Sequence, residues 1–395
     1  MQTSTQNYMN KDRKTKLIAA LQSEIDKQRL PGAVVKVVQG GKELVFEALG
    51  QQNPNEGTAM ALDSIFRIYS MTKPIVSVAV MMQMEQGKLL LNDSVSKYLP
   101  EFSKQRVALE ANGEVSYVST KNDATIQDLL RHTSGLTYEF LGNTAVQKAY
   151  RSSKIGMSLR DANNAEFSRI LAALPLQFEP STAWEYSRAT DVLGGVIEAI
   201  GGQSLGGHLK QHLLQPLGLF DTDFSLPPDQ HHRIAEPFAK DPDGGYLMRL
   251  IDLRKTPAMD SGGGGLASTA LDYARFLQFL LNRGELDGVR LLAPHTVDYM
   301  TADHLGQIPI NRRGGSGALM PPGQGFGLGV AVRTHLGLVP VPGTVGSYYW
   351  GGIAGTTFFV DPAQQLFALL MIQAPNQREY YRPLFRDLVY AALLD

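Results

Sequence analysis

Ser70 and Lys73 are the two residues of this chain whose types and spacing are best suited to chemistry. In a helix, residues three apart lie on one face, with their Cβ atoms about 5–6 Å apart. A serine hydroxyl is a weak nucleophile until a neighbour takes its proton. A lysine can assist as a base of lowered pKa or as a cation that acidifies a second group. This S-x-x-K spacing therefore predicts a nucleophilic serine.

The segment after Ser70 predicts a buried helix that would hold this pair in place. Residues 74–84 are apolar on nearly every side, which is typical of a core helix, and Gly87 favours its end. Ser70 would lie at the N-terminus, where free N–H groups and the helix dipole favour an anion. Lys73 precedes Pro74, so we expect some strain in this first turn. The alternative is that Ser70 only caps the helix, which is the commoner role.

Two other serines fit catalytic patterns, but their surroundings predict no active site. Ser94 and Lys97 repeat the S-x-x-K spacing, yet Pro100 follows closely and no sustained helix would fix their geometry. Ser204 lies in a G-x-S-x-G sequence, the nucleophile motif of α/β-hydrolases, which requires a preceding strand. Because residues 191–200 predict a helix, we interpret Ser204 as the cap of the next helix.

Three further segments could complete a site around Ser70. Tyr186 precedes a predicted helix and could carry a proton beside a cation, although most tyrosines only pack and hydrogen-bond. The glycines after Trp350 precede a predicted strand, where an N–H could hold an oxyanion or where the chain could simply form a bulge. The glycine loop after Ser261 permits unusual dihedral angles but lacks the Lys-Ser/Thr ending of a phosphate-binding loop.

The histidines predict neither a Ser-His-Asp triad nor a metal site. His132 lies in a segment that predicts a structural corner, and His231-His232 lies in a polar loop that we expect to be exposed. His208 and His212 have the spacing of zinc hydrolases, but Leu209 stands where that motif carries its glutamate. Two histidines on a polar helix face are more often solvated. We therefore expect no metal and no cofactor.

Composition and charge indicate a globular protein that does not act mainly on nucleic acid. The chain has 395 residues, of which 43% are hydrophobic and 19% charged, enough for about two to three domains. Its 37 basic and 38 acidic residues give a net charge of -1, which argues against a nucleic-acid partner. The absence of cysteine excludes disulfides and thiol chemistry. No apolar run approaches the ~20 residues of a membrane span. The N-terminus lacks an apolar secretory core, so we expect a cytoplasmic protein, although a chain whose leader had been removed would look the same.

Strand patterns at both ends of the chain predict a single sheet. A lone hairpin is only marginally stable in water, so the N-terminal strands need the C-terminal ones as partners. We expect a mainly antiparallel sheet covered by the first and last helices. The strands are predicted at 33–38, 44–49, 325–332, 356–360 and 366–372, and the two helices at 11–29 and 378–393.

The middle of the chain predicts a helical domain inserted into the sheet domain. We expect helices near 126–131, 166–173, 191–200, 205–214 and 270–282. The fold class is therefore α+β, with a discontinuous sheet domain at 1–87 and 301–395 and a mainly helical domain at 88–300. The active cleft would lie between them, and loops 138–165 and 305–324 would shape its pocket.

Taken in order, these segments resemble the serine β-lactamase and penicillin-recognising superfamily over roughly residues 15–393. The closest resemblance is to the family VIII carboxylesterases, relatives of the class C β-lactamases. It implies a β-lactamase/transpeptidase-like fold and a cofactor-free serine carboxylesterase that hydrolyses short-chain esters. The motifs that carry the resemblance are Ser70-x-x-Lys73, His132-Thr133-Ser134-Gly135-Leu136, Trp184-x-Tyr186-Ser187, the Ser261 glycine loop and Trp350-Gly351-Gly352.

The resemblance also implies a role for each site residue. Ser70 is the acylated nucleophile, and Tyr186 with Lys73 shuttles its proton. The backbone N–H groups of Ser70 and Ile353 form the oxyanion hole. The implied substrate-binding residues are Tyr138, Trp184, Trp350, Gly351 and Gly352.

Two departures from the superfamily pattern favour a small-molecule ester as the substrate. Trp350 stands where peptidases and β-lactamases carry the lysine that holds a substrate carboxylate. Arg188 stands where class C enzymes carry an asparagine, which weakens the case for amide substrates and leaves the role of Arg188 open. A β-lactamase or D,D-peptidase, an acyltransferase using the same acyl-enzyme, and an inactive scaffold are the alternatives.

Overall fold

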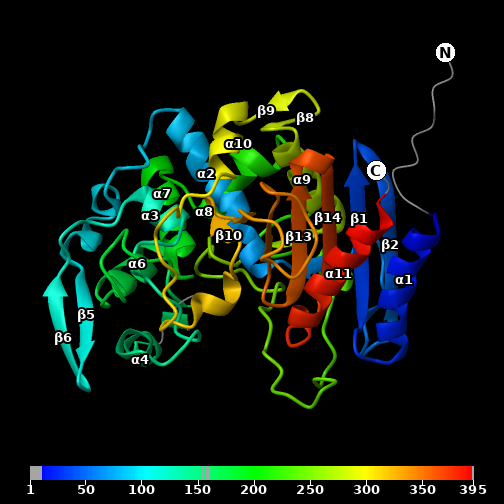
Figure 1. Ribbon diagram of the computed structural model, residues 1–395, viewed down its shortest axis with the longest axis horizontal. Coiled ribbons are helices and arrows are strands. Elements are labelled where there is room, and N and C mark those ends of the chain that lie inside the picture. Colours follow the sequence, from blue (N-terminus) through cyan, green and yellow to red (C-terminus); the bar gives the residue numbers. More distant parts are fainter. Residues whose placement is uncertain (1–10, 154, 157–160, 394–395) are drawn as a thin grey trace.

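The computed structural model describes residues 11–153, 155–156 and 161–393, and its main feature is an eight-stranded antiparallel sheet (Figure 1). The strand order is β10-β11-β12-β13-β14-β1-β2-β3, so both chain ends contribute to one sheet, as predicted. The N-terminal strands are β1 (Gly32–Gln39), β2 (Lys42–Asn53) and β3 (Thr58–Ala59). The C-terminal strands are β10 (Gln324–Phe326), β11 (Ala331–Arg333), β12 (Tyr348–Gly351), β13 (Gly355–Asp361) and β14 (Leu366–Gln373).

The first and last helices cover one face of this sheet, as the sequence predicts. Helices α1 (Lys11–Asp26) and α11 (Arg378–Ala392) contact each other and lie side by side over the strands (Figure 1). Leu21 of α1 packs in one core cluster with Val35 of β1. Successive strand residues point to opposite faces, so Val34 joins the other core, which contains α2 and α9. Each fully buried side chain of this kind contributes about 1.5–3 kcal/mol.

Helix α2 (Thr72–Glu85) carries the buried segment predicted after Ser70. Its residues 72–83 are all buried, and Gly87 just beyond its end has φ +67°. Helix α2 packs on α7 (Ala189–Gly201). The other described α-helices are α3 (Ile126–Leu130), α4 (Ala145–Ser152), α6 (Asn164–Ala172), α8 (Leu205–Leu209), α9 (Ala270–Leu281) and α10 (Pro294–Met300). Short strand pairs join β4 (Ile65–Arg67) to β7 (Ala267–Thr269) and β8 (Glu285–Leu286) to β9 (Val289–Arg290).

The single strand predicted over 325–332 is wrong, because the chain reverses there. Strands β10 and β11 pair with each other, with Phe326 opposite Ala331. Gly329 lies in the connection with φ +98°, and a Cβ there would lie 2.3 Å from the hydroxyl of Ser77 on α2. A left-handed glycine at this point lets the hairpin turn close against α2.

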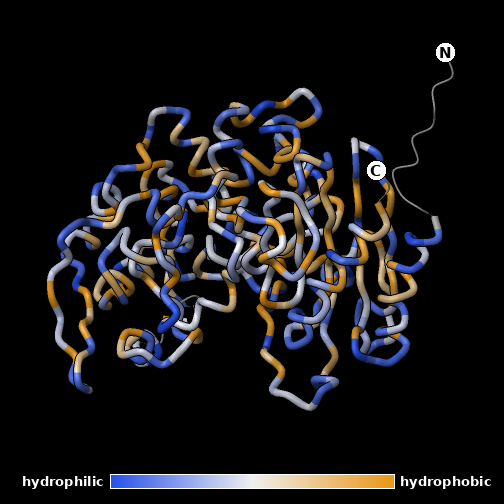
Figure 2. Tube along the Cα trace, in the orientation of Figure 1, coloured by the Kyte–Doolittle hydropathy of each residue, from blue (hydrophilic) through white to orange (hydrophobic). Residues whose placement is uncertain are grey.

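A hairpin in the central segment was not predicted. Strands β5 (Arg106–Ala111) and β6 (Glu114–Ser119) pair through Asn112-Gly113, both with positive φ. The hairpin projects from the end of the molecule opposite α1, and apolar residues run along it (Figures 1 and 2). Asn-Gly between alternating residues is a strong hairpin signal, so the sequence carried the information.

The boundaries of the two domains stay a prediction. Helix α9 falls in the range 88–300 assigned to the helical domain, yet it packs on β14 and β1 of the sheet. Within the described ranges, none of the helices combines the length and the apolar character that crossing a membrane requires.

His208 on α8 should make the stability of the fold sensitive to acid. Its ring is buried, with Nε2 3.1 Å from Nε2 of Gln83 on α2, and burial lowers its pKa to about 4. The unfolded chain binds the proton near pH 6.5 and the folded chain only near pH 4, so this stability is present above pH 6.5 and lost as the pH falls towards 4. We expect His208→Gln to reduce the fall in melting temperature between those pH values. A fall as steep as in the wild type would contradict this. His232→Gln, which replaces an exposed histidine, is the matched control.

Candidate active site

Ser70 lies in a single 3₁₀ turn, Tyr69–Met71, that leads directly into α2. Tyr69 has φ +43°, a left-handed conformation that costs a non-glycine residue about 1–3 kcal/mol. The strain predicted for Lys73 before Pro74 is a different feature, because both of those residues lie within α2; the left-handed residue is Tyr69, immediately before Ser70. The Tyr69 hydroxyl accepts a hydrogen bond from the Ile251 N–H at 2.9 Å. The turn leaves Ser70 on the wall of a cavity.

Lys73 is fully buried one turn further along, and its ammonium meets three oxygen acceptors. Nζ lies 3.3 Å from Ser70 Oγ, 3.0 Å from the Tyr138 hydroxyl and 2.6 Å from the Gly263 carbonyl. A protonated lysine has three hydrogens to donate, so each can find a partner here. These three contacts fix the Lys73 amine within reach of the serine.

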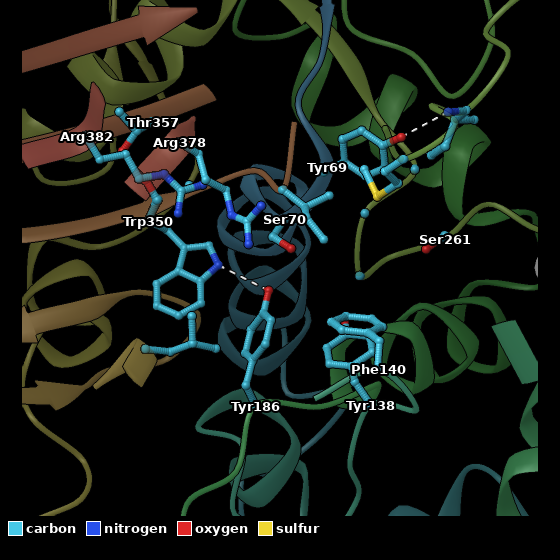
Figure 3. Close-up of a pocket in the computed structure, with 18 of the residues that line it drawn as sticks. Tyr69, Ser70, Tyr138, Phe140, Tyr186, Ser261, Trp350, Thr357, Arg378 and Arg382 are labelled. Atoms are coloured by element: carbon cyan, nitrogen blue, oxygen red, sulfur yellow. Dashed lines mark hydrogen bonds between the residues drawn. The ribbon is translucent and has the colours of Figure 1, made fainter. Parts of the chain in front are cut away.

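Tyr186 and Trp350 approach the same point from the opposite wall. The indole Nε1 of Trp350 donates to the Tyr186 hydroxyl at 3.3 Å, and Figure 3 shows that hydroxyl pointing towards Ser70. Lys73 Nζ lies 4.6 Å from the centre of the Tyr186 ring. The structure thus brings Ser70, Lys73 and Tyr186 together.

Tyr138 is the second tyrosine of the site, and its environment differs. Burial, together with the nearby Tyr186 and Asp191, holds the pKa of the Tyr138 hydroxyl well above 10. Its ring centre lies 5.2 Å from that of Tyr186. Tyr138 therefore stays protonated at neutral pH, which leaves Tyr186 as the candidate proton acceptor.

Ile353, the second predicted oxyanion donor, lies in the turn between β12 and β13 and lines the cavity with Ser70. In the described ranges of the chain, its N–H has no hydrogen-bond acceptor. Gly352 N–H, by contrast, donates to Thr356 O at 2.8 Å, which shapes this turn. An unpaired N–H beside a nucleophile can stabilise the oxyanion of a tetrahedral intermediate.

These residues open onto a cavity of about 1190 Å³, which is larger than most small-molecule sites. Tyr138, Trp350 and Gly351, the residues proposed to bind substrate, line it together with Phe140, Phe224 and Leu319. Loop 248–257 and residues 318–321 close its other sides. The cavity is therefore wide, with many apolar side chains in its walls.

Sequence and structure comparisons assign the chain to a family. A beta-lactamase family model matches residues 16–391. The chain belongs to the beta-lactamase family. It is 34% identical over 397 residues to esterase EstB of Burkholderia gladioli, covering 95% of each chain.

Two solved structures have the same fold as this chain. EstCE1, described as a hydrolase with promiscuous acyltransferase activity, has a TM-score of 0.78 and 27% identity over 96% of this chain and 98% of its own. Unliganded simvastatin synthase LovD from Aspergillus terreus has a TM-score of 0.77 and 25% identity over 97% and 99%. These matches confirm the predicted β-lactamase/transpeptidase-like fold and the resemblance to family VIII esterases.

Trp184 and Gly352, which were predicted to bind substrate, do not line the cavity. Trp184 is fully buried, with its ring 5.5 Å from that of Phe326 and 6.4 Å from that of His132. Because Tyr186 on the same segment faces the site, Trp184 packs behind it in the core. A Cβ on Gly352 would come within 2.4 Å of Ile68 O. Gly352 therefore leaves space for the backbone that leads into the turn with Ser70.

The other serine motifs and His132 have structural surroundings, as predicted. Lys97 pairs with Asp93 at 2.9 Å, and Ser204 caps α8 by accepting from Gly207 N–H at 3.1 Å. His132 Nδ1 lies 3.0 Å from Ser187 Oγ. Burial, followed by the charge of Lys73, holds the pKa of His132 well below 6.5, so its ring is neutral.

Asp191 is a site residue that the sequence analysis missed. Its carboxylate accepts from Ser261 Oγ at 2.6 Å and from Gly263 N–H at 2.9 Å. A Cβ on Gly263 would lie 2.7 Å from that carboxylate, so the loop needs glycine to approach it. Asp191 thereby fixes the carbonyl that binds Lys73. An acid in the first turn of a helix near a glycine loop was the available signal.

The sequence left the role of Arg188 open. In the structure its side chain contacts Tyr138 and Asp191, which hold Lys73 from two sides. Its guanidinium pairs with Glu139 at 2.5 Å and with Asp191 at 3.6 Å, and lies 4.8 Å from the centre of the Tyr138 ring. The side chain is almost completely buried. It therefore connects Tyr138 on one side of Lys73 with the Asp191–Gly263 contact on the other.

We expect Arg188→Gln to lower kcat about 10- to 100-fold with a smaller change in KM, because Lys73 loses its fixed position. It should also lower the melting temperature, since an unpaired buried carboxylate costs about 3–5 kcal/mol. Arg188→Lys should restore part of the rate. Steady-state kinetics with pH–rate profiles would measure this, and an Arg188→Gln enzyme with wild-type kcat would contradict it. Glu139→Gln, which leaves Asp191 paired, is the matched control.

Proposed function

We propose that this protein hydrolyses carboxylic esters through an acyl-enzyme formed on Ser70. The observation that carries the proposal is the ammonium of Lys73, 3.3 Å from Ser70 Oγ and bound to two further oxygens, beside a tyrosine whose hydroxyl accepts from Trp350. The chain is a carboxylic ester hydrolase of the β-lactamase fold, in agreement with its similarity to esterase EstB and to EstCE1.

The proposed steps use only groups on this chain. The Tyr186 oxygen takes the hydroxyl proton as Ser70 Oγ attacks the ester carbonyl, and the Lys73 cation favours the phenolate form of that tyrosine. The N–H groups of Ser70 and Ile353 stabilise the tetrahedral oxyanion. Tyr186 then gives the proton to the leaving alkoxide. Water repeats the cycle on the acyl-enzyme and releases the acid.

Esters are favoured over β-lactams because of Trp350. Its indole occupies the position where β-lactamases carry a lysine, and its N–H donates to Tyr186. We propose that the enzyme prefers esters with short acyl chains, which rates across a series of chain lengths would test. We also propose that the enzyme is cytoplasmic, which cell fractionation would test.

The test is a comparison of p-nitrophenyl butyrate with a chromogenic cephalosporin at equal enzyme concentration. We expect kcat/KM for the ester to exceed that for opening of the lactam by orders of magnitude. A cephalosporin opened as fast as the ester is cleaved would instead assign the protein as a β-lactamase.

Acyl transfer is a second candidate, favoured by the size of the cavity. About 1190 Å³ can hold an acyl group and an acceptor alcohol together. EstCE1 is described as having promiscuous acyltransferase activity. Adding an alcohol during turnover should yield a transesterified product if the acceptor competes with water, and only free acid if it does not.

A further inference from the structure

The cavity has a cationic wall that the proposed mechanism does not use. Helix α11 places Arg378, Arg382 and Arg386 four residues apart, on one helix face, and all three line the cavity. Like charges at this spacing repel each other. Figure 3 shows Arg378 and Arg382 on the same side of the site as Trp350.

Arg382 is held beside the edge of β12. Its Nη2 donates to Gly352 O at 2.5 Å, and a Cβ on Gly351 would lie 2.8 Å from its guanidinium carbon. Its Nε is buried and has no hydrogen-bond partner among the described residues. Burial, which the neighbouring carboxylate of Glu379 does not offset, lowers the pKa of Arg382 to about 10. The Arg382 guanidinium is thus shielded from water, and one of its N–H groups has no hydrogen-bond acceptor among the described residues.

The two nearest arginines share one carboxylate. Glu379 Oε1 lies 3.1 Å from Arg378 Nε and 3.7 Å from Arg382 Nη1, and the Glu379 side chain is 70% exposed. An exposed carboxylate compensates weakly because water screens it. Arg378 Nη1 donates to the neutral carbonyl of Pro375. The two arginines and the one carboxylate of Glu379 therefore carry a net charge of one positive unit.

We propose that Arg378 and Arg382 bind a carboxylate of the substrate, so that this esterase acts on esters that carry a free carboxylate. The proposal rests on the proposed function. Guanidinium groups bind carboxylates through paired, charge-assisted hydrogen bonds. Trp350 on β12 stands where β-lactamases carry a positively charged lysine. In this chain the positive charge comes instead from α11, beyond Gly351 and Gly352.

The test compares two matched ester pairs, because the carboxylate can belong to either half of the ester. For the acyl half, mono-p-nitrophenyl glutarate is compared with p-nitrophenyl butyrate. For the alcohol half, 4-carboxyphenyl butyrate is compared with phenyl butyrate. We expect the wild type to prefer the anionic member of one pair about tenfold or more in kcat/KM, as a hydrogen-bonded charge pair allows.

Arg382→Met and Arg378→Met should each reduce that ratio severalfold or more. The ratio is taken within one variant, so a general loss of activity or of folded protein cancels. Arg249→Met, which removes a cation that loop 248–257 contributes to the same cavity, should keep the wild-type ratio. No preference in either wild-type pair, or ratios that both α11 variants leave unchanged, would overturn the subsite. Failure of the wild type to cleave any of the four esters would instead overturn the proposed function.

Discussion

Alanine at position 70 should reduce ester hydrolysis about 10³-fold or more. The change removes the atom that we propose forms the covalent bond to the acyl group, while Lys73, Tyr186 and the cavity remain. Removing the nucleophile from such a set of groups costs nearly as much as removing the whole set. The measurement is kcat/KM for p-nitrophenyl butyrate with purified wild type and Ser70→Ala.

Ser94→Ala and Ser204→Ala are the matched controls for this variant. Both serines belong to catalytic-looking sequences, and both have structural neighbours: Ser94 Oγ bonds Ser96 Oγ, and Ser204 caps α8. We expect wild-type kcat from both controls. An active Ser70→Ala enzyme together with an inactive control would show that the serine replaced in that control is the nucleophile.

Phenylalanine at position 186 should lower kcat about 10²- to 10⁴-fold, the usual contribution of a positioned acid–base group. The ring would remain between Tyr138 and Trp350, whose ring centres lie 5.2 and 5.1 Å from it. What disappears is the oxygen that, in the proposed mechanism, receives the proton from Ser70. The Trp350 N–H would also lose its acceptor, which should cost some stability.

Tyr138→Phe separates the roles of the two tyrosines. It removes the oxygen that accepts from Lys73 at 3.0 Å but leaves Tyr186 unchanged. We expect a smaller loss in kcat than for Tyr186→Phe, because Lys73 keeps its contacts to Ser70 and Gly263. A larger loss for Tyr138→Phe would assign the proton transfer to Tyr138 instead.

The pairing of Ser70 with Lys73 at the start of α2 follows directly from the sequence. An apolar helix with a serine and a lysine three apart fixes both the burial of Lys73 and its distance from Ser70. The sheet was also predictable, because the strands of each chain end leave apolar faces that only the other end can cover. In both cases local pattern and burial point to the same structure.

The parts that sequence reasoning missed depend on contacts between distant segments. Trp184 and Tyr186 are two apart, and nothing local says which of them faces the cavity. Asp191 fixes the glycine loop 72 positions away, and Arg382 lies against Gly352 across 30 positions. Such pairings depend on how the elements pack, which the periodicity of one segment does not contain.

Mass spectrometry of the acylated protein tests the central claim most directly. Wild-type enzyme would be quenched within milliseconds to seconds of mixing with a panel of activated esters, then weighed intact and digested to locate the adduct. The account predicts an added acyl mass on the peptide that contains Ser70, absent from Ser70→Ala. Full ester turnover with the acyl mass on another residue, or with no adduct for any ester of the panel, would contradict it.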